Sequence, residues 1–112
     1  MTATAGAPSR DEIQETVDRA LQPGPPPPYE ELVALEQTLL LIIAGLWATV
    51  DEFARQHPAA PGHTRRRARL NGIRQQTSVG LGDGLISAQV QVRVLAADCQ
   101  WLLSQCATEA SR

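Results

Sequence analysis

One stretch of the chain, from Leu32 to Phe53, is apolar over most of its length. At 100° per residue its large apolar side chains fall on one arc, which is the pattern of an amphipathic α-helix. The residues of this arc are Leu32, Leu35, Leu39, Ile42, Ile43, Leu46, Trp47, Val50 and Phe53. Val33, Leu40 and Leu41 lie outside the arc, so we expect this helix to be covered from several sides, by its own chain or by a partner.

A second apolar pattern predicts a long helix over residues 84–108. Its positions repeat at alternating steps of three and four, as in a heptad seam: Leu85, Ala88, Val92, Leu95, Cys99, Leu102 and Cys106. A further stripe lies on the nearly opposite side and comprises Ile86, Val90, Val94, Ala97 and Trp101. Residues 88–94 also alternate as a strand would, but the heptad spacing around them favours a helix. A helix with two apolar faces needs neighbours on both, and a second copy of the chain is one candidate.

Two shorter helices complete the pattern. Ser9 and Glu12 form a capping-box pattern ahead of a short amphipathic segment that ends at Pro23-Gly24. Arginine-rich residues 64–78 predict another helix, and the glycines of residues 80–84 predict the turn after it. The sequence therefore predicts an all-α fold, a small helical bundle with one short N-terminal helix and three longer ones.

The 112 residues suit one domain. We divide them into a flexible tail, residues 1–8, and a single helical-bundle domain, residues 9–112, with a proline-rich linker at 23–28. Within this linker, Pro25–Pro28 are expected to form a stiff spacer. The alternative is a PxxP segment that docks on an aromatic groove of another protein.

Charge is spread unevenly along the chain. Residues 1–60 hold nine acids and three arginines, whereas residues 61–112 hold seven arginines and three acids. The net charge of −2 disfavours a dedicated nucleic-acid binder. On the predicted helix, the arginines flank the apolar stripe on both sides: Arg65, Arg66, Arg67, Arg69 and Arg74. We therefore expect their stems to pack along its rim and to pair with the acidic first half of the chain.

The sequence gives no sign of membrane insertion or export. The uncharged part of the long apolar stretch runs only from Gln37 to Val50, which is shorter than the ~20 residues that a bilayer needs. The first residues lack the basic flank and apolar run of a signal peptide. We therefore expect a buried core helix, no membrane partner and a cytoplasmic protein.

No catalytic set, metal site or cofactor site can be assembled from the spacing of residues. Cys99 and Cys106 are about two helical turns apart, too far for a disulfide, and neither stands at zinc-ligand spacing from a histidine. A polar site between helices would draw on four candidates: Glu36, Arg66, Arg93 and Asp98. An interface would draw on Trp47, Trp101, Val90 and Val94, since aromatic residues often anchor interfaces. A core position is the alternative for both tryptophans.

Several short segments in the second half of the chain resemble a known family. They are Leu70-Asn71-Gly72-Ile73-Arg74, Gly80-Leu81-Gly82-Asp83-Gly84-Leu85, Val90-Gln91-Val92-Arg93 and Asp98-Cys99-Gln100-Trp101-Leu102-Leu103. They resemble small uncharacterised actinobacterial helical proteins labelled as natural product biosynthesis proteins, and the match is strongest over residues 70–106. The label implies an association with secondary metabolism, without an established reaction and without catalytic residues to carry over.

These observations lead to one functional expectation and two alternatives. We expect a non-catalytic accessory or interaction protein that binds a partner protein, or itself as a homodimer, through apolar helix faces. The alternative is a small-molecule binding protein or enzyme with its site between the helices. A weaker alternative is a DNA-linked regulator that uses the helix from Arg65 to Arg74.

Overall fold

The structure, a computed structural model, describes residues 9–110 and gives the side chains of residues 9–106. The proposed tail, residues 1–8, lies outside this part of the chain. Four helices follow one another: α1 (Arg10–Ala20), α2 (Tyr29–Gln56), α3 (His63–Thr77) and α4 (Leu85–Ala110). The described residues contain no strand. The predicted all-α bundle, with a short first helix and three longer ones, is therefore confirmed, and the alternating residues 88–94 belong to a helix.

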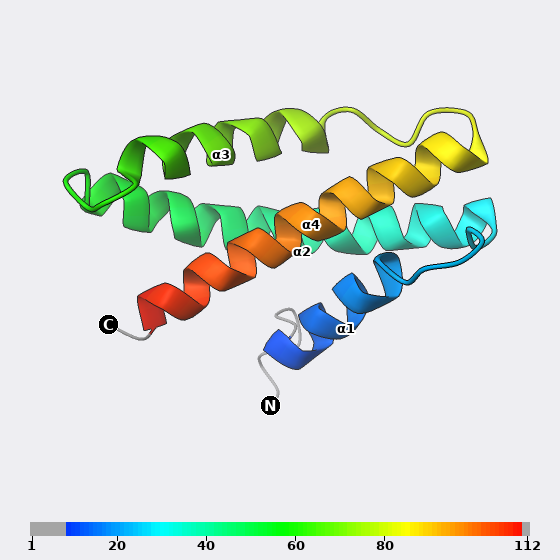
Figure 1. The fold of residues 1–112 in the computed structure, drawn as a ribbon, viewed down its shortest axis with the longest axis horizontal. Coiled ribbons are helices and arrows are strands. Elements are labelled where there is room, and N and C mark those ends of the chain that lie inside the picture. Colours follow the sequence, from blue (N-terminus) through cyan, green and yellow to red (C-terminus); the bar gives the residue numbers. More distant parts are fainter. Residues whose placement is uncertain (1–8, 111–112) are drawn as a thin grey trace.

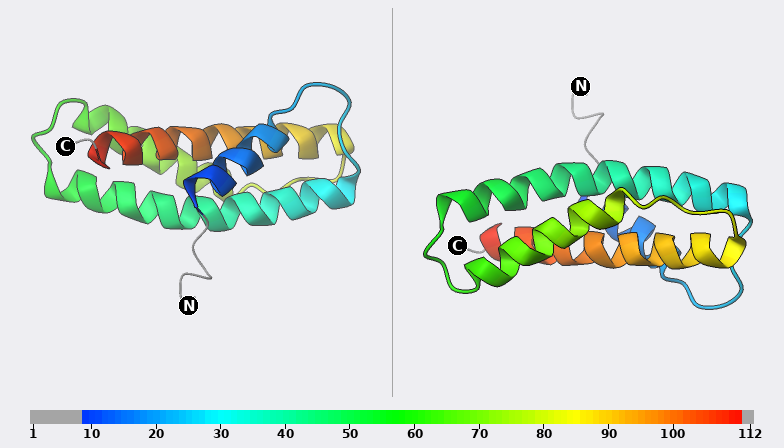
Figure 2. Two further views of the ribbon diagram at one scale, coloured as in Figure 1. Left: turned by 90° about the horizontal axis from the view of Figure 1, so that it is seen from below. Right: turned by 90° about the horizontal axis from the view of Figure 1, so that it is seen from above.

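The two long helices, α2 and α4, lie side by side and run in the same direction (Figure 1). Helix α3 crosses one face of this pair, and α1 crosses the opposite face (Figure 2). Each helix runs opposite to the one before it in the chain, which is the arrangement expected of helices joined by short loops. The core lies between α2 and α4 and is closed by α1 and α3.

The core is built largely from the apolar stripes that the sequence predicts, but Ala96 and Leu103 of α4, which belong to neither predicted stripe, are also buried. Within α2 the buried residues are Leu32, Leu35, Leu39, Ile42, Ile43, Val50 and Ala54. Leu46, Trp47 and Phe53, which complete the predicted arc, are half-buried. From α4 the buried positions of the heptad seam are Ala88, Val92, Leu95, Cys99 and Leu102. Of its two end positions, Leu85 is exposed and Cys106 is half-buried.

By length and composition alone, α2 could also cross a membrane. The core helix of a soluble protein meets the same criteria, and one side of α2 forms the centre of this bundle. The compact fold is consistent with a soluble protein.

The first helix is fixed by a local cap and by its apolar side. Ser9 Oγ accepts a 3.1 Å hydrogen bond from the backbone N–H of Glu12, and the Glu12 carboxylate accepts a 2.7 Å bond from the backbone N–H of Ser9. This is the predicted capping box, and such caps stabilise a helix by about 1 kcal/mol. The side chains of Ile13 and Val17 are buried in the core. Because isolated helices this short are marginal in water, the docking maintains α1.

The turn between α3 and α4 is pinned to the start of α2. Gly80 and Gly82 have φ of +82° and +78°, a conformation that favours glycine. The hydroxyl of Tyr29 donates a 2.8 Å hydrogen bond to the carbonyl of Gly82. This bond joins the start of α2 to the loop that precedes α4. The proline segment is at the same end of the bundle (Figure 1), and Pro26 and Pro27 are half-buried.

Candidate functional site

Helix α3 is held on both flanks by an arginine stacked on a tryptophan. On the α4 side, Cζ of Arg69 lies 5.3 Å from the ring centroid of Trp101. On the α2 side, Cζ of Arg74 lies 5.1 Å from the ring centroid of Trp47. The indole Nε1 of Trp47 donates a 2.8 Å hydrogen bond to the carbonyl of Leu70. Both tryptophans are half-buried, so they are seam residues between helices, neither fully in the core nor free on the surface.

Asp98 of α4 is a buried carboxylate, with 2% of its surface exposed. Nη2 of Arg69 lies 3.2 Å from its Oδ1. The side-chain amide of Gln76, oriented so that both groups are satisfied, donates to both carboxylate oxygens, at 2.9 Å for Oδ1. Burial raises the pKa of Asp98 to about 6, and the charge of Arg69 opposes this rise. The buried acid therefore depends on two side chains of α3 for its stabilisation.

The thiol beside this carboxylate is unreactive. Cys99 is buried, and burial together with the charge of Asp98 raises its pKa to about 11. A thiol with this pKa stays protonated near neutral pH and is a poor nucleophile. Among the described residues, no group of three or more His, Cys, Asp or Glu side chains is placed to hold a metal ion.

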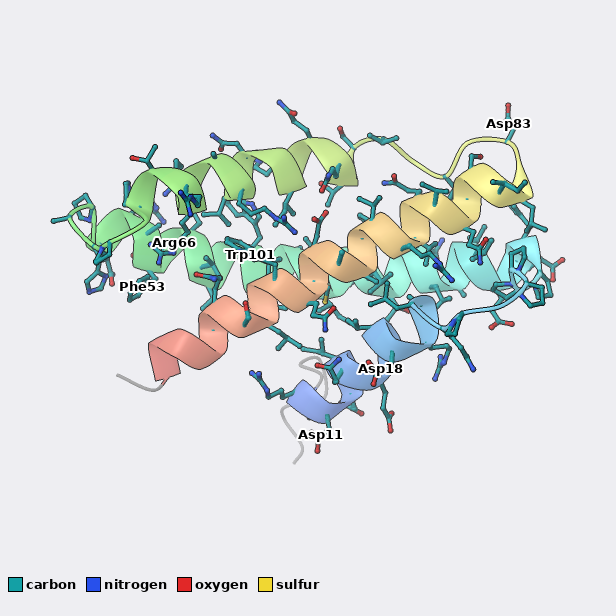
Figure 3. All side chains as sticks on the ribbon, in the orientation of Figure 1. Asp11, Asp18, Phe53, Arg66, Asp83 and Trp101 are labelled. Atoms are coloured by element: carbon teal, nitrogen blue, oxygen red, sulfur yellow. The ribbon has the colours of Figure 1, made fainter. Side chains whose placement is uncertain are left out.

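A cavity with basic walls lies between the first half of α3 and the last turns of α4. Its volume is about 300 Å³, and its lining residues are Gly62, Arg65, Arg66, Arg69, Trp101 and Gln105. We call it the basic cavity. Nε of Arg66 donates a 3.1 Å hydrogen bond to Oε1 of Gln105, and Nη1 of Arg66 is buried without a hydrogen-bond partner. The guanidinium also lies over the Phe53 ring, at 5.7 Å from its centroid. Figure 3 shows Arg66 between α3 and the two long helices.

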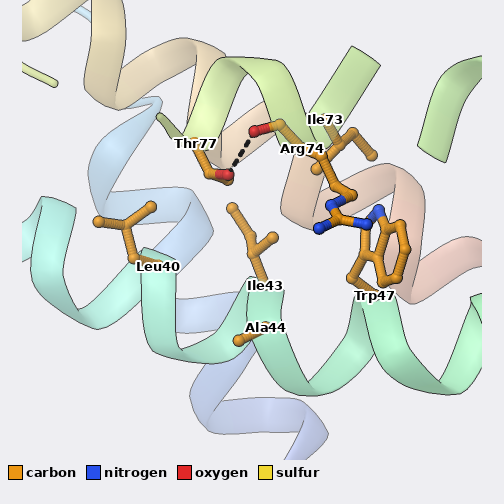
Figure 4. A pocket seen from close by; sticks show the side chains of 7 residues that line it. All are labelled: Leu40, Ile43, Ala44, Trp47, Ile73, Arg74 and Thr77. Atoms are coloured by element: carbon orange, nitrogen blue, oxygen red, sulfur yellow. Dashed lines mark hydrogen bonds between the residues drawn. The ribbon is translucent and has the colours of Figure 1, made fainter. Parts of the chain in front are cut away.

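A second cavity, of about 320 Å³, opens between α2 and α3 (Figure 4). Its lining residues are Leu40, Ile43, Ala44, Trp47, Ile73, Arg74 and Thr77. The walls are mainly apolar, and Arg74 supplies the one charge among the lining residues. We call this the apolar groove. It has the composition of a site for a small apolar molecule with one anionic group.

The four predicted polar-site residues are not brought together. Asp98 and Arg66 both lie along the seam of α3 and α4, but Arg69, and not Arg66, pairs with Asp98. Nη2 of Arg93 donates a 2.8 Å hydrogen bond to the carbonyl of Gln22, in the segment after α1. Glu36 is half-exposed on α2 and lines neither the basic cavity nor the apolar groove.

Sequence reasoning missed the residues that contact Asp98. Arg69 was recognised only as one of five arginines that flank a stripe, and Gln76 was not singled out. Their spacing along the chain from Asp98 carries no signal, because the crossing angle of α3 over α4 decides which side chains reach the carboxylate. The expected pairing of these arginines with the acidic first half is found for Arg67, whose salt bridge to Asp51 of α2 lowers the pKa of that carboxyl. Arg69 pairs instead with Asp98, in the second half of the chain.

The predicted interface residues also differ in how far they are exposed. Val90 is 56% exposed, whereas Val94 is half-buried, and the two tryptophans lie beneath arginines. Exposed large apolar side chains occur instead at the start of α2, in the loop after α3 and in the first turns of α4. We call this set the apolar end: Tyr29, Val79, Leu85, Ile86 and Val90. Ile86 and Val79 are 75% and 69% exposed.

A family model described as a family of unknown function, DUF6415, matches residues 11–111. The match covers nearly the whole chain, and the chain therefore belongs to this family. No curated protein and no solved structure matches the chain. The description of the family names no activity and supplies no functional residues.

Proposed function

We propose that this chain, as a member of the DUF6415 family, is a non-catalytic accessory protein that binds a partner protein or a second copy of itself. The surface used is the apolar end, centred on Ile86 and Val90 of α4. We further propose that it acts in the cytoplasm. A link to natural product biosynthesis rests on the resemblance of residues 70–106 to proteins with that label.

One observation carries this proposal. The middle of the heptad stripe of α4, from Ala88 to Leu102, is buried, while Ile86 and Val90, from its second apolar stripe, are 75% and 56% exposed. Burying a side chain of this kind at an interface is favourable by about 1.5–3 kcal/mol. Ile86 and Val90 are four residues apart on α4 and therefore share one side of the helix. Contiguous exposed apolar surface on a small protein marks an interaction site.

The test is a double variant, Ile86→Ser with Val90→Ser, compared with Leu41→Ser. Leu41 is 77% exposed on α2 and lies outside the apolar end, so it is a matched control. Native mass spectrometry is expected to give a dimer, or a stoichiometric complex with one co-purified protein, for the wild type and for Leu41→Ser. The double variant is expected to be monomeric. A wild type that is monomeric and without a partner at about 100 µM, a concentration that would populate even a complex stabilised by only about 5.5 kcal/mol, overturns the proposal.

The second candidate function is small-molecule binding between the helices. The apolar groove favours it, because Trp47 and Arg74 combine an apolar wall with one cation in a cavity of about 320 Å³. DNA-linked regulation has less support. Arg67 is engaged by Asp51, and Arg69 and Arg74 lie over tryptophan rings, so the arginines of α3 do not form one outward face.

A further inference from the structure

The start of α3 carries positive charge where helices usually carry negative charge. The helix begins after Gly62 without a side-chain cap, and its first turn has no acidic residue. Residues 65–67 are instead three consecutive arginines. The positive end of the helix dipole and these guanidinium groups repel one another. An anion at this place would relieve the repulsion.

Two of the charges that line the basic cavity lack a carboxylate partner among the described side chains. Arg69 pairs with Asp98. Arg67, which does not line the cavity, pairs with Asp51. Arg65 makes no ion pair with residues 9–106, and Arg66 has only the amide of Gln105 and the Phe53 ring. In addition, Nη1 of Arg66 is a buried donor without an acceptor. Leaving such a donor unpaired is unfavourable, so the protein itself pairs this guanidinium incompletely. Because Nη1 is closed to solvent, an anion in the cavity would meet the other atoms of the Arg66 guanidinium.

The shape of the cavity complements this charge. Its volume of about 300 Å³ is at the lower end of the range for small-molecule sites. Trp101, with Arg69 over its ring, supplies apolar surface to the lining. Arg65 and Arg66 also line the cavity, and guanidinium groups are planar forks that match phosphate oxygens. Together they carry two positive charges, which corresponds to the charge of about −1.5 to −2 on a phosphate monoester.

We propose that the basic cavity binds the phosphate group of a small phosphate monoester, with Arg65 and Arg66 as its main ligands and Trp101 against the organic part. Free phosphate offers the same oxygen atoms without the organic part. This site is separate from the apolar end and does not depend on the proposed protein interaction.

The experiment is isothermal titration calorimetry of the full chain with phenyl phosphate, inorganic phosphate and benzoate at one ionic strength. Phenyl phosphate is expected to bind at least fivefold more tightly than inorganic phosphate, and benzoate more weakly than both. Equal affinity for phenyl phosphate and inorganic phosphate would indicate a site for free phosphate and would overturn the proposal that the ligand is a phosphate monoester. Equal affinity for all three would overturn the site.

Variants locate the binding. Arg65→Gln and Arg66→Gln are each expected to weaken phenyl phosphate at least tenfold. Arg55→Gln is the matched control, because it removes the same charge from an exposed position that lines neither the basic cavity nor the apolar groove. Arg65 is exposed, so its variant keeps the test valid if Arg66→Gln does not fold. Unchanged affinity in Arg65→Gln, or an equal loss in Arg55→Gln, would overturn the proposal.

The two indole N–H signals in an NMR spectrum give an independent readout. The signal of Trp101 is expected to shift with phenyl phosphate, whereas that of Trp47, which is hydrogen-bonded to Leu70, is expected to stay. Trp47→Phe assigns the two signals. A single-stranded oligonucleotide that shifts Trp101, when phenyl phosphate does not, would overturn the small-molecule site in favour of a nucleic-acid surface.

Discussion

Arg69 and Asp98 form an asymmetric ion pair across the seam of α3 and α4. The carboxylate side chain is 3% exposed, while the guanidinium side chain is 42% exposed, and the two are 3.2 Å apart. The acid has therefore lost its hydration, whereas the arginine keeps much of its own. Removing water from a charge is costly, and a partner that remains half in solvent offsets the cost only in part. Burial accordingly raises the pKa of Asp98 in spite of the adjacent cation.

Asp98→Asn is expected to make the protein more stable near pH 7.5. The pKa of Asp98 is about 6 in the folded chain, against 3.8 as its ordinary value. Between these values the folded chain holds a proton that the unfolded chain has released, so the free energy of unfolding falls as pH rises and levels off above pH 6. The difference corresponds to at most about 3 kcal/mol. Urea unfolding at pH 4 and pH 7.5 measures it.

In this comparison, Asp98→Asn and the wild type are expected to agree at pH 4 and to separate by about 1–3 kcal/mol at pH 7.5. Asp83→Asn, at an exposed position in the loop before α4, is the control. Its free energy of unfolding is expected to equal that of the wild type at both pH 4 and pH 7.5. A loss of stability in Asp98→Asn at pH 7.5 would mean that the attraction between the two charges exceeds the cost of burial.

Arg69→Gln is expected to lower the free energy of unfolding by about 1–3 kcal/mol at pH 7.5, because it leaves a buried carboxylate without its cation. The loss is expected to be smaller at pH 4, where Asp98 is protonated. In the Asp98→Asn background the same substitution is expected to have little effect beyond the lost contact with Trp101. Arg65→Gln, one turn earlier and exposed, is the control. An equal loss in both backgrounds would refute the coupling of the pair.

Trp47→Phe is expected to lower the free energy of unfolding by about 1–2 kcal/mol. The substitution removes the part-buried hydrogen bond from the indole N–H to the Leu70 carbonyl, so this carbonyl loses a donor. Trp101→Phe is the matched comparison. Its ring is also stacked under an arginine, but its indole N–H makes no hydrogen bond with the described residues. Thermal unfolding of both variants tests the difference, and equal losses would assign the effect to ring size.

Leu95→Asp is expected to unfold the domain. Leu95 is 0% exposed in the buried stripe of α4, and an unpaired carboxylate there would cost more than about 4 kcal/mol. Val90→Asp places the same charge on the exposed stripe, five residues earlier in α4, and is expected to keep the fold. Circular dichroism melting distinguishes them. A cooperative, unshifted transition in Leu95→Asp would refute the core assignment.

The helices and their buried sides could be predicted from the sequence, whereas the contacts between side chains of different helices could not. The buried stripes of α2 and α4 could be predicted because apolar periodicity along one helix directly reports which side meets the core. The capping box of Ser9 and Glu12 could be predicted because its partners are three residues apart. The partner of Asp98 could not be predicted, since three other arginines, Arg65, Arg66 and Arg67, lie within about one turn of Arg69 on α3. Only the placement of one helix on another selects among them.

The sequence alone therefore determined that the chain forms four helices, where they begin and end to within a few residues, and which stripes are buried. These properties depend on neighbours along the chain. Tertiary structure decided that Arg69 meets Asp98, that both tryptophans lie beneath arginines, and that Arg65 and Arg66 share a cavity. Such contacts depend on the crossing angles and axial register of helices, which the packing of the whole core sets, and no local pattern encodes them.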